Sequence, residues 1–417
     1  MRTRTDDQDP LIPTSTARSQ LWTVPIKDRP KSHGSWFSYI VFPIVFNIGI
    51  LSINTTQLLC WPLAILPPTR PLYYKILRST KSSWCSLILL ISILFGPTSL
   101  VLTAGEGIDL DDIVVRRDKT DDRVIGLDLP KRAVVMGNHQ AYTDWLYIWV
   151  LGYFAGTADG VYILLKKSLK WIPFVGWGCQ FFDFLFLARR WAQDKGPLFK
   201  YLNRLSTESV KNHDPIWMMV FPEGTIVSDQ ERANSSAYAK KQDIDDTINV
   251  LLPHSLGLQT ILHQLSQNLP SLPVLDITIG YPGVPPAGAA QEYHNLFSIF
   301  HRSVPPPAVH MHLRMYDSAQ IPLGAQGGES TSDREAFGAW LLERWREKDR
   351  LMAAYYRDGV FPTQESEQGV QGGSIEVPVR FRSNWEAGNA LCWGFPLVGL
   401  PVVWGILGWG VWKLVTG

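Results

Sequence analysis

A histidine followed five positions later by an aspartate is the first pattern in the chain that could do chemistry. His139 follows the apolar run Ala133–Met136, and Asp144 precedes the apolar run Trp145–Phe154. The two side chains would lie on different faces of one continuous helix, but they can meet if His139 is on a strand-exit turn and Asp144 begins the next helix. A carboxylate bound to one imidazole nitrogen fixes the tautomer and leaves the other nitrogen free to deprotonate an alcohol.

The same spacing also fits a structural interpretation without catalysis. A histidine can make a hydrogen bond within a turn, and an aspartate can cap a helix. Because a histidine and an aspartate at this spacing often occur together by chance, His139 and Asp144 by themselves favour the structural interpretation.

Three further segments place arginine, glutamate or glycine at the ends of apolar runs. The sequence Phe-Pro-Glu-Gly-Thr occupies Phe221–Thr225, Arg189 follows a run that ends at Leu187, and Tyr281–Gly283 closes another run. An arginine at a strand end can be solvated or can bind a phosphate in bidentate fashion, and glycine permits a sharp turn. Sites of α/β proteins form at strand ends, so the segments together are more specific than any one of them.

The alternation of short apolar runs and longer amphipathic runs predicts the elements that would position these residues. It indicates an α/β fold with a mainly parallel sheet flanked by helices. The expected strands are Ala133–Met136, Val161–Leu165, Phe181–Leu187, Ile216–Phe221, Val274–Tyr281 and Val309–Met315, and the expected helices are Trp145–Phe154, Pro197–Leu205, Gly257–Ser266 and Arg334–Arg357.

Two long uncharged stretches precede this region, at residues 34–69 and 82–105. Each exceeds the ~20 apolar residues that cross a bilayer. Residues 34–105 are therefore predicted to form N-terminal membrane helices that either span the bilayer or make a re-entrant hairpin. The loop between the stretches is basic, as is the polar segment 1–33, so the positive-inside rule does not separate the two topologies. Residues 1–33 themselves are predicted to be a disordered tail.

The remaining boundaries follow from composition. Residues 106–320 are predicted to form the α/β domain, 321–360 a loop and an amphipathic C-terminal helix, and 361–386 a linker. Residues 387–417 contain a third uncharged run with tryptophans spread along it, which predicts a C-terminal membrane anchor kinked or broken by prolines.

The charge balance argues against a nucleic-acid partner. The chain has 39 basic and 38 acidic residues and a formal net charge of +1, and it contains no helix-turn-helix or RNA-binding signature. Its four cysteines form no Cys-x-x-Cys pair, so neither a disulfide framework nor a zinc site is expected.

The polar segments, in their order, resemble the glycerophospholipid acyltransferases typified by lysophosphatidic acid acyltransferase. The resemblance rests on the Asn-His-x4-Asp block at 138–144, the Phe-Leu-x-Arg block at 186–189, Phe-Pro-Glu-Gly-Thr at 221–225 and the run ending at Tyr281-Pro282. It covers roughly Val134 to Gly283. Details around Tyr142–Trp145 and Arg190–Asp194 are most similar to the branch that remodels lysophosphatidylinositol and lysocardiolipin.

The resemblance implies a membrane-bound acyltransferase that moves a fatty acyl group from acyl-CoA to the free hydroxyl of a lysophospholipid. The acceptor would be lysophosphatidic acid, lysophosphatidylinositol or lysocardiolipin. His139 would be the general base, Asp144 would orient it, and Arg189 would bind the acceptor's phosphate. The resemblance implies no metal and no covalent acyl-enzyme, and it implies no cofactor beyond acyl-CoA as a co-substrate. The acceptor site would also include Glu223, Gly224 and Thr225.

Two positions qualify this expectation. Lys166 begins a basic, aromatic segment that could lie on anionic lipid headgroups, although a solvated basic turn fits equally well. His254 stands where the family often has an arginine after the Phe-Pro-Glu-Gly block, so a fixed positive charge is not expected there.

Alternatives to this activity remain at this point. A serine hydrolase is disfavoured because no Gly-x-Ser-x-Gly elbow is present. A non-catalytic lipid-binding membrane protein is disfavoured by the intact His139 and Asp144, and a CoA-independent transacylase is not excluded. The expected partners are acyl-CoA, a lysophospholipid and the lipid bilayer, with the endoplasmic reticulum as the predicted membrane and a mitochondrial membrane as the alternative.

Overall fold

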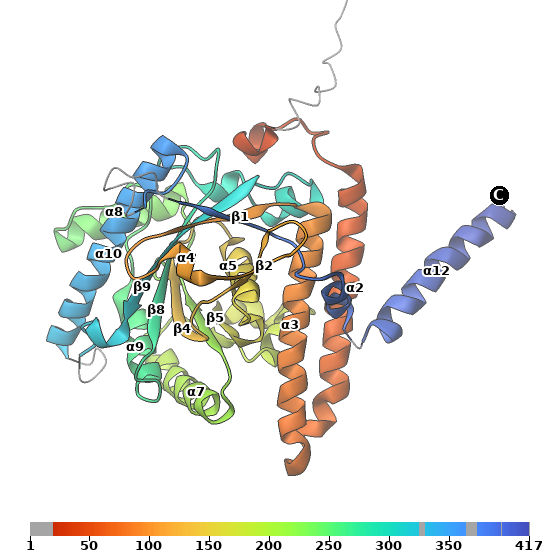
Figure 1. Cartoon of the computed structure of the whole chain (residues 1–417), viewed down its shortest axis with the longest axis horizontal. Coiled ribbons are helices and arrows are strands. Elements are labelled where there is room, and N and C mark those ends of the chain that lie inside the picture. The colour runs from red at the N-terminus through yellow and green to blue at the C-terminus, as the bar shows by residue number, and fades with distance from the viewer. Residues whose placement is uncertain (1–19, 325–329, 364–372, 393, 417) are drawn as a thin grey trace, which may run out of the picture.

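A twisted eight-stranded sheet forms the centre of the computed structural model, which describes residues 20–324, 330–363, 373–392 and 394–416 (Figure 1). The pairs β1–β10 and β8–β9 are antiparallel and the other five pairs are parallel. The predicted α/β fold with a mainly parallel sheet is confirmed. In spatial order the strands are β10 (Ile375–Pro378), β1 (Ser99–Ala104), β9 (Ala308–Asp317), β8 (Pro273–Gly280), β4 (Arg132–Gly137), β7 (Ile216–Val220), β5 (Val161–Lys166) and β6 (Leu185–Leu187).

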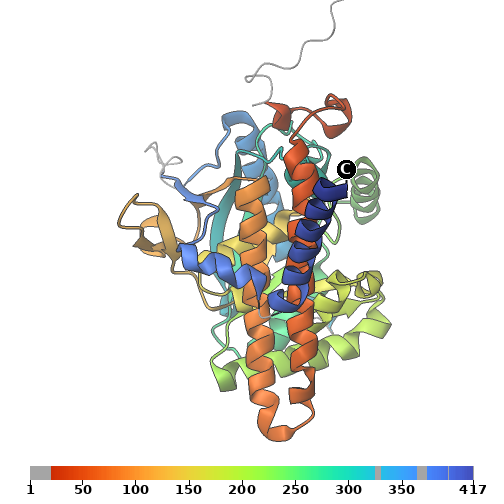
Figure 2. The same cartoon turned by 90° about the vertical axis from the view of Figure 1, so that its right-hand side faces the viewer.

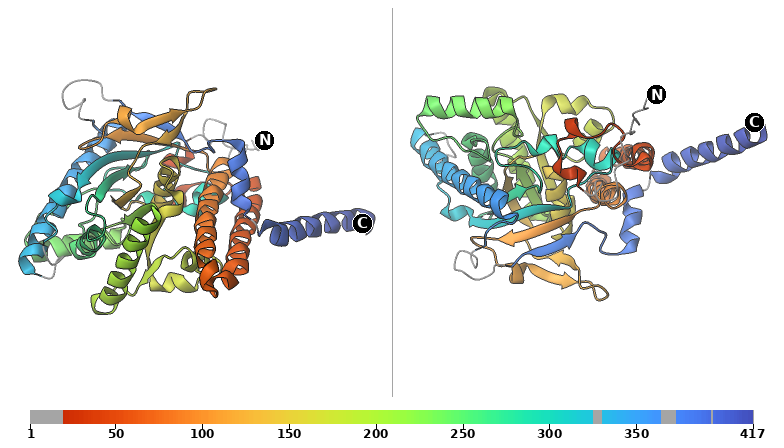
Figure 3. Two further views of the ribbon diagram at one scale, coloured as in Figure 1. Left: turned by 60° about the horizontal axis from the view of Figure 1, so that its bottom comes forward. Right: turned by 90° about the horizontal axis from the view of Figure 1, so that it is seen from above.

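The sheet separates two hydrophobic cores, as alternation along β4 shows. Ala133 and Val135 pack with helices α3 (Arg70–Phe95) and α5 (Asp144–Phe154), whereas Val134 and Met136 pack on the opposite face. Successive strand side chains point to opposite faces, so a strand buried on both sides is apolar throughout. Figure 3 shows these helix layers on either side of the sheet. The helices of the second layer are α7 (Trp191–Asn212), α9 (Ser255–Ser266) and α10 (Thr331–Asp358).

All four predicted helices are present, but one expected strand and one helix differ from the prediction. Helices α5, α9 and α10 agree with the expected ranges, and α7 begins six residues before the expected Pro197. The expected strand Phe181–Leu187 is wrong in its first half, because helix α6 (Val175–Phe181) ends there and Asp183 adopts a left-handed conformation with φ 60°. Helix α8 (Asp229–Gln242) was not predicted because it buries only Ser235 and Ala239, so it carries no apolar stripe.

The N-terminal segment is ordered over residues 20–33, so the predicted disordered tail is wrong for this part; residues 1–19 lie outside the described residues. Arg29 explains the order, because its guanidinium donates to the Val24 carbonyl, the Ser298 hydroxyl and the Tyr293 carbonyl at 2.8, 2.5 and 2.7 Å. The arginine is only 5% exposed. Residues 20–33 are therefore fixed by the buried Arg29 although their composition is polar.

Helices α2 (Trp36–Cys60) and α3 form an antiparallel hairpin whose tip projects beyond the rest of the molecule, as Figure 2 shows. Both are long and apolar enough to cross a membrane by length and composition. Helix α3 is nevertheless fixed to the sheet domain in its middle. Arg78 pairs with Asp159 at 2.5 Å and also with Asp214, and the buried Lys81 ammonium lies 3.6 Å from the Tyr162 ring centroid.

The sheet takes in residues that were expected to lie outside it. Helix α3 ends at Phe95, before Gly96 and Pro97, and β1 then pairs with β9. The uncharged stretch 82–105 is therefore part helix and part core strand. Strand β10 likewise comes from the expected linker 361–386, of which residues 364–372 lie outside the described residues.

Helix α12 (Phe395–Thr416) forms most of the expected C-terminal anchor. The chain enters it against α2, where the Gly394 amide donates to the Thr56 hydroxyl at 2.7 Å and the Ser52 hydroxyl donates to the Leu391 carbonyl. From there the helix points away from the sheet domain (Figure 1). Its insertion into a bilayer stays a prediction.

Candidate active site

The polar segments singled out in the sequence gather at one edge of the sheet. Strands β4, β7, β5 and β6 are parallel neighbours, so their carboxyl ends share that edge. His139 follows β4, Glu223 follows β7, Lys166 ends β5 and Arg189 follows β6. The carboxyl edge of parallel strands is where α/β domains form their sites.

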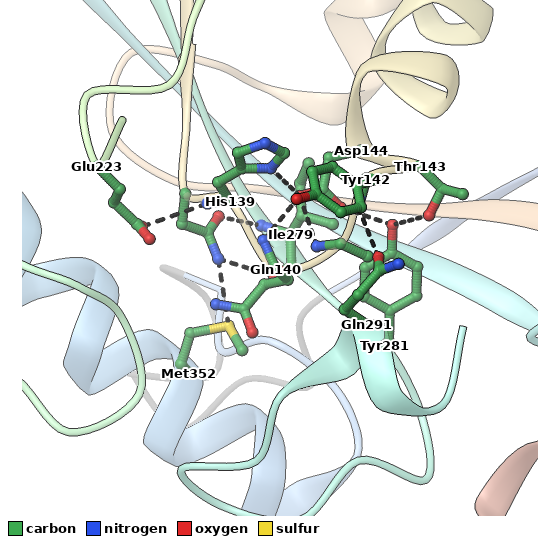
Figure 4. A network of polar contacts seen from close by, with 12 residues as sticks. His139, Gln140, Tyr142, Thr143, Asp144, Glu223, Ile279, Tyr281, Gln291 and Met352 are labelled. Carbon is green, nitrogen blue, oxygen red and sulfur yellow. Dashed lines mark hydrogen bonds and ion pairs between the residues drawn. The ribbon is translucent and has the colours of Figure 1, made fainter. Parts of the chain in front are cut away.

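His139 and Asp144 meet as the turn-and-helix arrangement required. The His139 Nδ1 atom lies 2.9 Å from Oδ2 of Asp144, the first residue of α5 (Figure 4). The same carboxylate oxygen accepts from the amides of Gln140 and Ala141 at 2.7 and 3.0 Å, and Oδ1 accepts from the Tyr281 hydroxyl at 2.6 Å. Asp144 is fully buried. Four donors therefore fix the Asp144 carboxylate beside the imidazole.

The second imidazole nitrogen of His139 is available for proton transfer. The ring stacks on Phe221 with 4.2 Å between centroids, and its side chain is 15% exposed. Since Nδ1 faces Asp144, the tautomer with a proton on Nδ1 leaves an acceptor lone pair on Nε2. Figure 4 shows that nitrogen pointing away from the carboxylate. The half-exposed Tyr142 ring lies beside the imidazole, with 6.4 Å between the two ring centroids.

The backbone around His139 is held from both sides. Its amide donates to Glu223 Oε1 at 3.3 Å, and its carbonyl accepts from the Val227 amide at 3.3 Å. The buried Asn138 side chain donates to the Ile279 carbonyl and accepts from the Ile279 amide, at 3.0 and 2.7 Å. These contacts tie the turn after β4 to the segments that follow β7 and end β8.

Glu223 lies next to the backbone of His139 and is 2% exposed. Its Oε1 atom accepts from the His139 amide and, at 3.4 Å, from the indole of Trp345 on α10. Burial raises the pKa of the Glu223 carboxyl to about 8, with a smaller contribution from the nearby Asp144 charge. The carboxyl is therefore mostly protonated at neutral pH and supports the turn that carries His139. Its predicted contact with the acceptor stays a prediction.

We expect Glu223→Gln to keep activity near the parent value at pH 7, because glutamine has the shape of the neutral acid and retains an acceptor oxygen. The parent should lose stability relative to this variant as pH rises from about 4.5 towards 8, since the unfolded chain binds fewer protons than the folded chain in that window. Thermal unfolding of both proteins in detergent across this pH range measures the difference. A constant difference would contradict the raised pKa.

Gly224 and Thr225 continue the same turn, and His254 lies beside it. Gly224 has φ 72°, a conformation that glycine adopts without strain, and a Cβ atom placed there would approach the His254 ring to 3.5 Å. The His254 amide donates to the Pro222 carbonyl at 2.8 Å. The position where the family often has arginine thus borders the predicted acceptor segment.

Arg189 and Lys166 are exposed at the same sheet edge. Arg189 adopts φ 61°, and its guanidinium makes no hydrogen bond or ion pair with any residue in the described part of the chain. After Lys166 the chain exposes apolar side chains, among them Trp171 at 72%. The structure places both cations at the predicted edge of the sheet.

The sequence did not predict several side chains that support the site residues. Tyr281 was recognised only as the end of a run, although its hydroxyl binds Asp144. Trp345 and Lys348 come from α10, and the buried Lys348 ammonium lies 2.5 Å from Asp276 and donates to the Ile277 carbonyl at 2.8 Å. The sequence signal that could have indicated the contact with α10 was Asp276, an acidic residue inside an otherwise apolar strand.

Comparison with known proteins finds matches to acyltransferases. A family model described as Acyltransferase matches residues 122–279, and one described as Acyltransferase C-terminus matches residues 298–393. An uncharacterized acyltransferase of Schizosaccharomyces pombe is 31% identical over 326 residues, which cover 77% of this chain and 85% of that protein. Lysocardiolipin acyltransferase 1 of Danio rerio is 28% identical over 320 residues, which cover 76% and 68%.

A third relative matches over a shorter stretch. The 2-acyl-1-lysophosphatidylinositol acyltransferase of Saccharomyces cerevisiae is 37% identical over 262 residues, which cover 56% of this chain and 64% of that protein, less than two thirds of its length. Among solved structures, the 1-acyl-sn-glycerophosphate acyltransferase PlsC from Thermotoga maritima matches 74% of this chain and 95% of its own, with 18% identity and a TM-score of 0.38.

The first family model contains the residues that follow β4, β6 and β7, and the second contains α10, whose Trp345 reaches Glu223. The match to the Schizosaccharomyces pombe protein extends over most of both chains. The chain therefore belongs to the glycerophospholipid acyltransferase family.

Proposed function

We propose that this protein transfers a fatty acyl group from acyl-CoA to the free hydroxyl of a lysophospholipid. The observation that carries the proposal is the His139–Asp144 pair, whose imidazole keeps Nε2 free at the edge of the sheet. A buried, fourfold-bound carboxylate favours the imidazolium that forms when Nε2 accepts a proton. Such a base suits a weakly acidic alcohol.

In the proposed reaction, His139 accepts one proton from the acceptor and later returns it to the leaving group. Nε2 takes the hydroxyl proton of the acceptor as its oxygen attacks the thioester carbonyl, and a bond forms between oxygen and the acyl carbon. The carbon–sulfur bond then breaks, and the sulfur of coenzyme A leaves with the electron pair. The imidazolium returns its proton to that sulfur, which restores the neutral histidine and releases the thiol.

The acceptor is proposed to be anchored by its phosphate. Arg189 stands free of protein partners among the described residues, and a guanidinium is well matched to phosphate oxygens. Lysophosphatidylinositol is the first acceptor to test, because a relative with 37% identity is described as a 2-acyl-1-lysophosphatidylinositol acyltransferase. Lysophosphatidic acid and lysocardiolipin follow from the other relatives.

The hairpin of α2 and α3 is proposed to enter the membrane from one side and to leave on the same side. The ion pairs of Arg78 fix α3 to the sheet domain, which leaves residues 70–77 to extend beyond that contact. Eight helical residues span about 12 Å. The hydrocarbon core is about 30 Å thick, so α3 cannot cross it while the domain stays in water.

This topology predicts how the hairpin tip can be labelled. In sealed vesicles, Leu66→Cys in a cysteine-free background should not react with an impermeant maleimide from the side opposite the sheet domain. Leu66 is 59% exposed in the protein, so only the membrane would shield it. Glu208→Cys on α7 reports the side of the domain. Labelling of the two positions from opposite sides would show that α2 and α3 span the bilayer.

The experiment that tests the proposed activity offers membranes containing this chain labelled acyl-CoA and a panel of lysophospholipids. Acylation of a lysophospholipid, absent from control membranes, is the expected result, and the preferred acceptor identifies the headgroup. A parallel assay supplies a labelled diacyl phospholipid as the only donor. Transfer from that donor without acyl-CoA would replace the proposal with transacylation, and no transfer from either donor would refute it.

A further inference from the structure

The backbone at Arg189 is held in an unusual conformation by a neighbouring carboxylate. Arg189 has φ 61°, a left-handed conformation that residues with a Cβ rarely adopt unless the surroundings impose it. Asp194 lies in the first turns of α7, and its two carboxylate oxygens accept from the amides of Ala188 and Arg190 at 2.8 and 2.9 Å. One side chain thus binds the backbone on both sides of Arg189.

The strand that carries Arg189 has little other support. Strand β6 is three residues long and lies at the edge of the sheet, and within the described ranges it pairs with β5 alone. Helix α7 holds its other end as well, because the Tyr201 hydroxyl donates to the Asp183 carbonyl at 2.7 Å and Arg204 binds both oxygens of the Asp183 carboxylate at 2.8 and 2.7 Å. The position of Arg189 therefore depends on α7 more than on the sheet.

The Asp194 carboxylate binds backbone amides and does not neutralise the Arg189 guanidinium. Both of its oxygens bind backbone amides, and among the described residues the carboxylate forms no ion pair with Arg189. The guanidinium keeps its charge and its donors for a ligand. Charged hydrogen bonds to phosphate need a fixed donor geometry, because immobilising a long side chain otherwise costs binding free energy.

We propose that Asp194 is the positioning residue of Arg189 and thereby sets the affinity for the phosphate of the acceptor. The inference rests on the proposed function, since it takes the acceptor to be a lysophospholipid bound through Arg189. It assigns a task to the segment Arg190–Asp194, which the site geometry otherwise leaves without one. Asp194 acts through the backbone and touches no substrate.

A simpler interpretation is that Asp194 only stabilises the start of α7, as acidic residues in a first turn often do. That task would lower stability and activity together on removal, whatever the acceptor. Positioning of Arg189 would instead raise KM for acceptors that carry a phosphate, and the effect would vanish once Arg189 itself is absent. The two interpretations therefore differ in acceptor dependence and in coupling.

The test measures KM and kcat of the full-length protein in membranes for lysophosphatidylinositol and for monoacylglycerol, which lacks a phosphate. Asp194→Ala should raise KM for lysophosphatidylinositol by about tenfold. The kcat value and the slow rate with monoacylglycerol should change by less than roughly twofold. Asp194→Asn retains one acceptor oxygen and should give an intermediate KM. Glu335→Gln, an exposed carboxylate on α10 whose side chain makes no hydrogen bond or ion pair with the described residues, is the matched control and should leave both constants unchanged.

The coupling experiment separates failure of this inference from failure of the proposed function. Adding Asp194→Ala to Arg189→Ala should raise KM no further. If Arg189→Ala raises KM and Asp194→Ala does not, or if the two effects multiply, Asp194 is not a positioning residue although phosphate binding by Arg189 stands. If Arg189→Ala leaves KM for lysophosphatidylinositol unchanged, the role of Arg189 in the proposed function is wrong, and this inference falls with it.

Discussion

His139→Ala is expected to lower kcat for acyl transfer by about 10²–10⁴-fold, the usual contribution of a positioned general base. The acceptor KM should change little, because Arg189 and the lipid chain bind independently of the imidazole. The variant should fold, since the ring contributes one partly exposed stack on Phe221 while the buried bonds of Asp144 to the Gln140 and Ala141 amides remain. Initial rates at matched protein amounts measure the loss.

Two comparisons make this result specific to the base. Added imidazole can occupy the space left in His139→Ala and should restore part of the rate if proton transfer is what was lost. His213→Asn is a matched control, because His213 is exposed after α7 at the opposite edge of the sheet, with φ 58°, which asparagine tolerates. Activity of His139→Ala within a few-fold of the parent would exclude His139 as the base.

Asp144→Asn is expected to lower kcat by about 10²-fold or more, as loss of the partner carboxylate does in related His–Asp arrangements. The amide can place its oxygen where Oδ2 accepts from the Gln140 and Ala141 amides and its nitrogen towards the Tyr281 hydroxyl, so the fold should persist. The negative charge that stabilises the imidazolium is lost. Steady-state kinetics with saturating acceptor measure kcat.

The matched variant is Tyr281→Phe, which removes one hydrogen bond from Asp144 and leaves its charge. It should reduce kcat by about tenfold at most, in line with one hydrogen bond to a charged group. Combining Asp144→Asn with His139→Ala should cost no more than His139→Ala alone, because the two residues act as a unit. Equal effects of Asp144→Asn and Tyr281→Phe would show that the charge of Asp144 does not matter.

The chemistry-bearing residues were predictable because their spacing is short and their strands are strongly apolar. His139 and Asp144 are separated by one turn, so a strand followed by a helix brings them together almost regardless of the rest of the fold. The alternation of short apolar runs with longer amphipathic runs also indicated a mainly parallel sheet, whose carboxyl edge collects the residues after β4, β5, β6 and β7. Local pattern therefore determined most of the site.

The rest depends on contacts between distant segments, which no local pattern records. Trp345 reaches Glu223 across 122 positions of the chain, and Arg29 is fixed by Ser298 and Tyr293 more than 260 positions away. Strand β1 is as apolar as the helix before it, and only its pairing with β9 distinguishes it from a longer membrane segment. Tertiary context decided each of these cases.

Contacts between distant segments also explain why the α2–α3 hairpin was incompletely predicted from the sequence. Arg78 and Lys81 were counted as a basic loop between two membrane segments, whereas they lie inside α3 and contact Asp159 and Tyr162. A charge in a long apolar helix was therefore a sign of contact with the sheet domain. The positive-inside rule could not reveal this, because it counts basic residues without knowing their partners.

One measurement tests the central claim most directly. Purified protein in lipid is given labelled acyl-CoA and lysophosphatidylinositol, and labelled phospholipid, free thiol and free fatty acid are measured together, beside His139→Ala. The account predicts one thiol released for each phospholipid formed, with both products nearly absent from the variant. Phospholipid without thiol, thiol with fatty acid in place of phospholipid, or an unchanged rate in His139→Ala would contradict it.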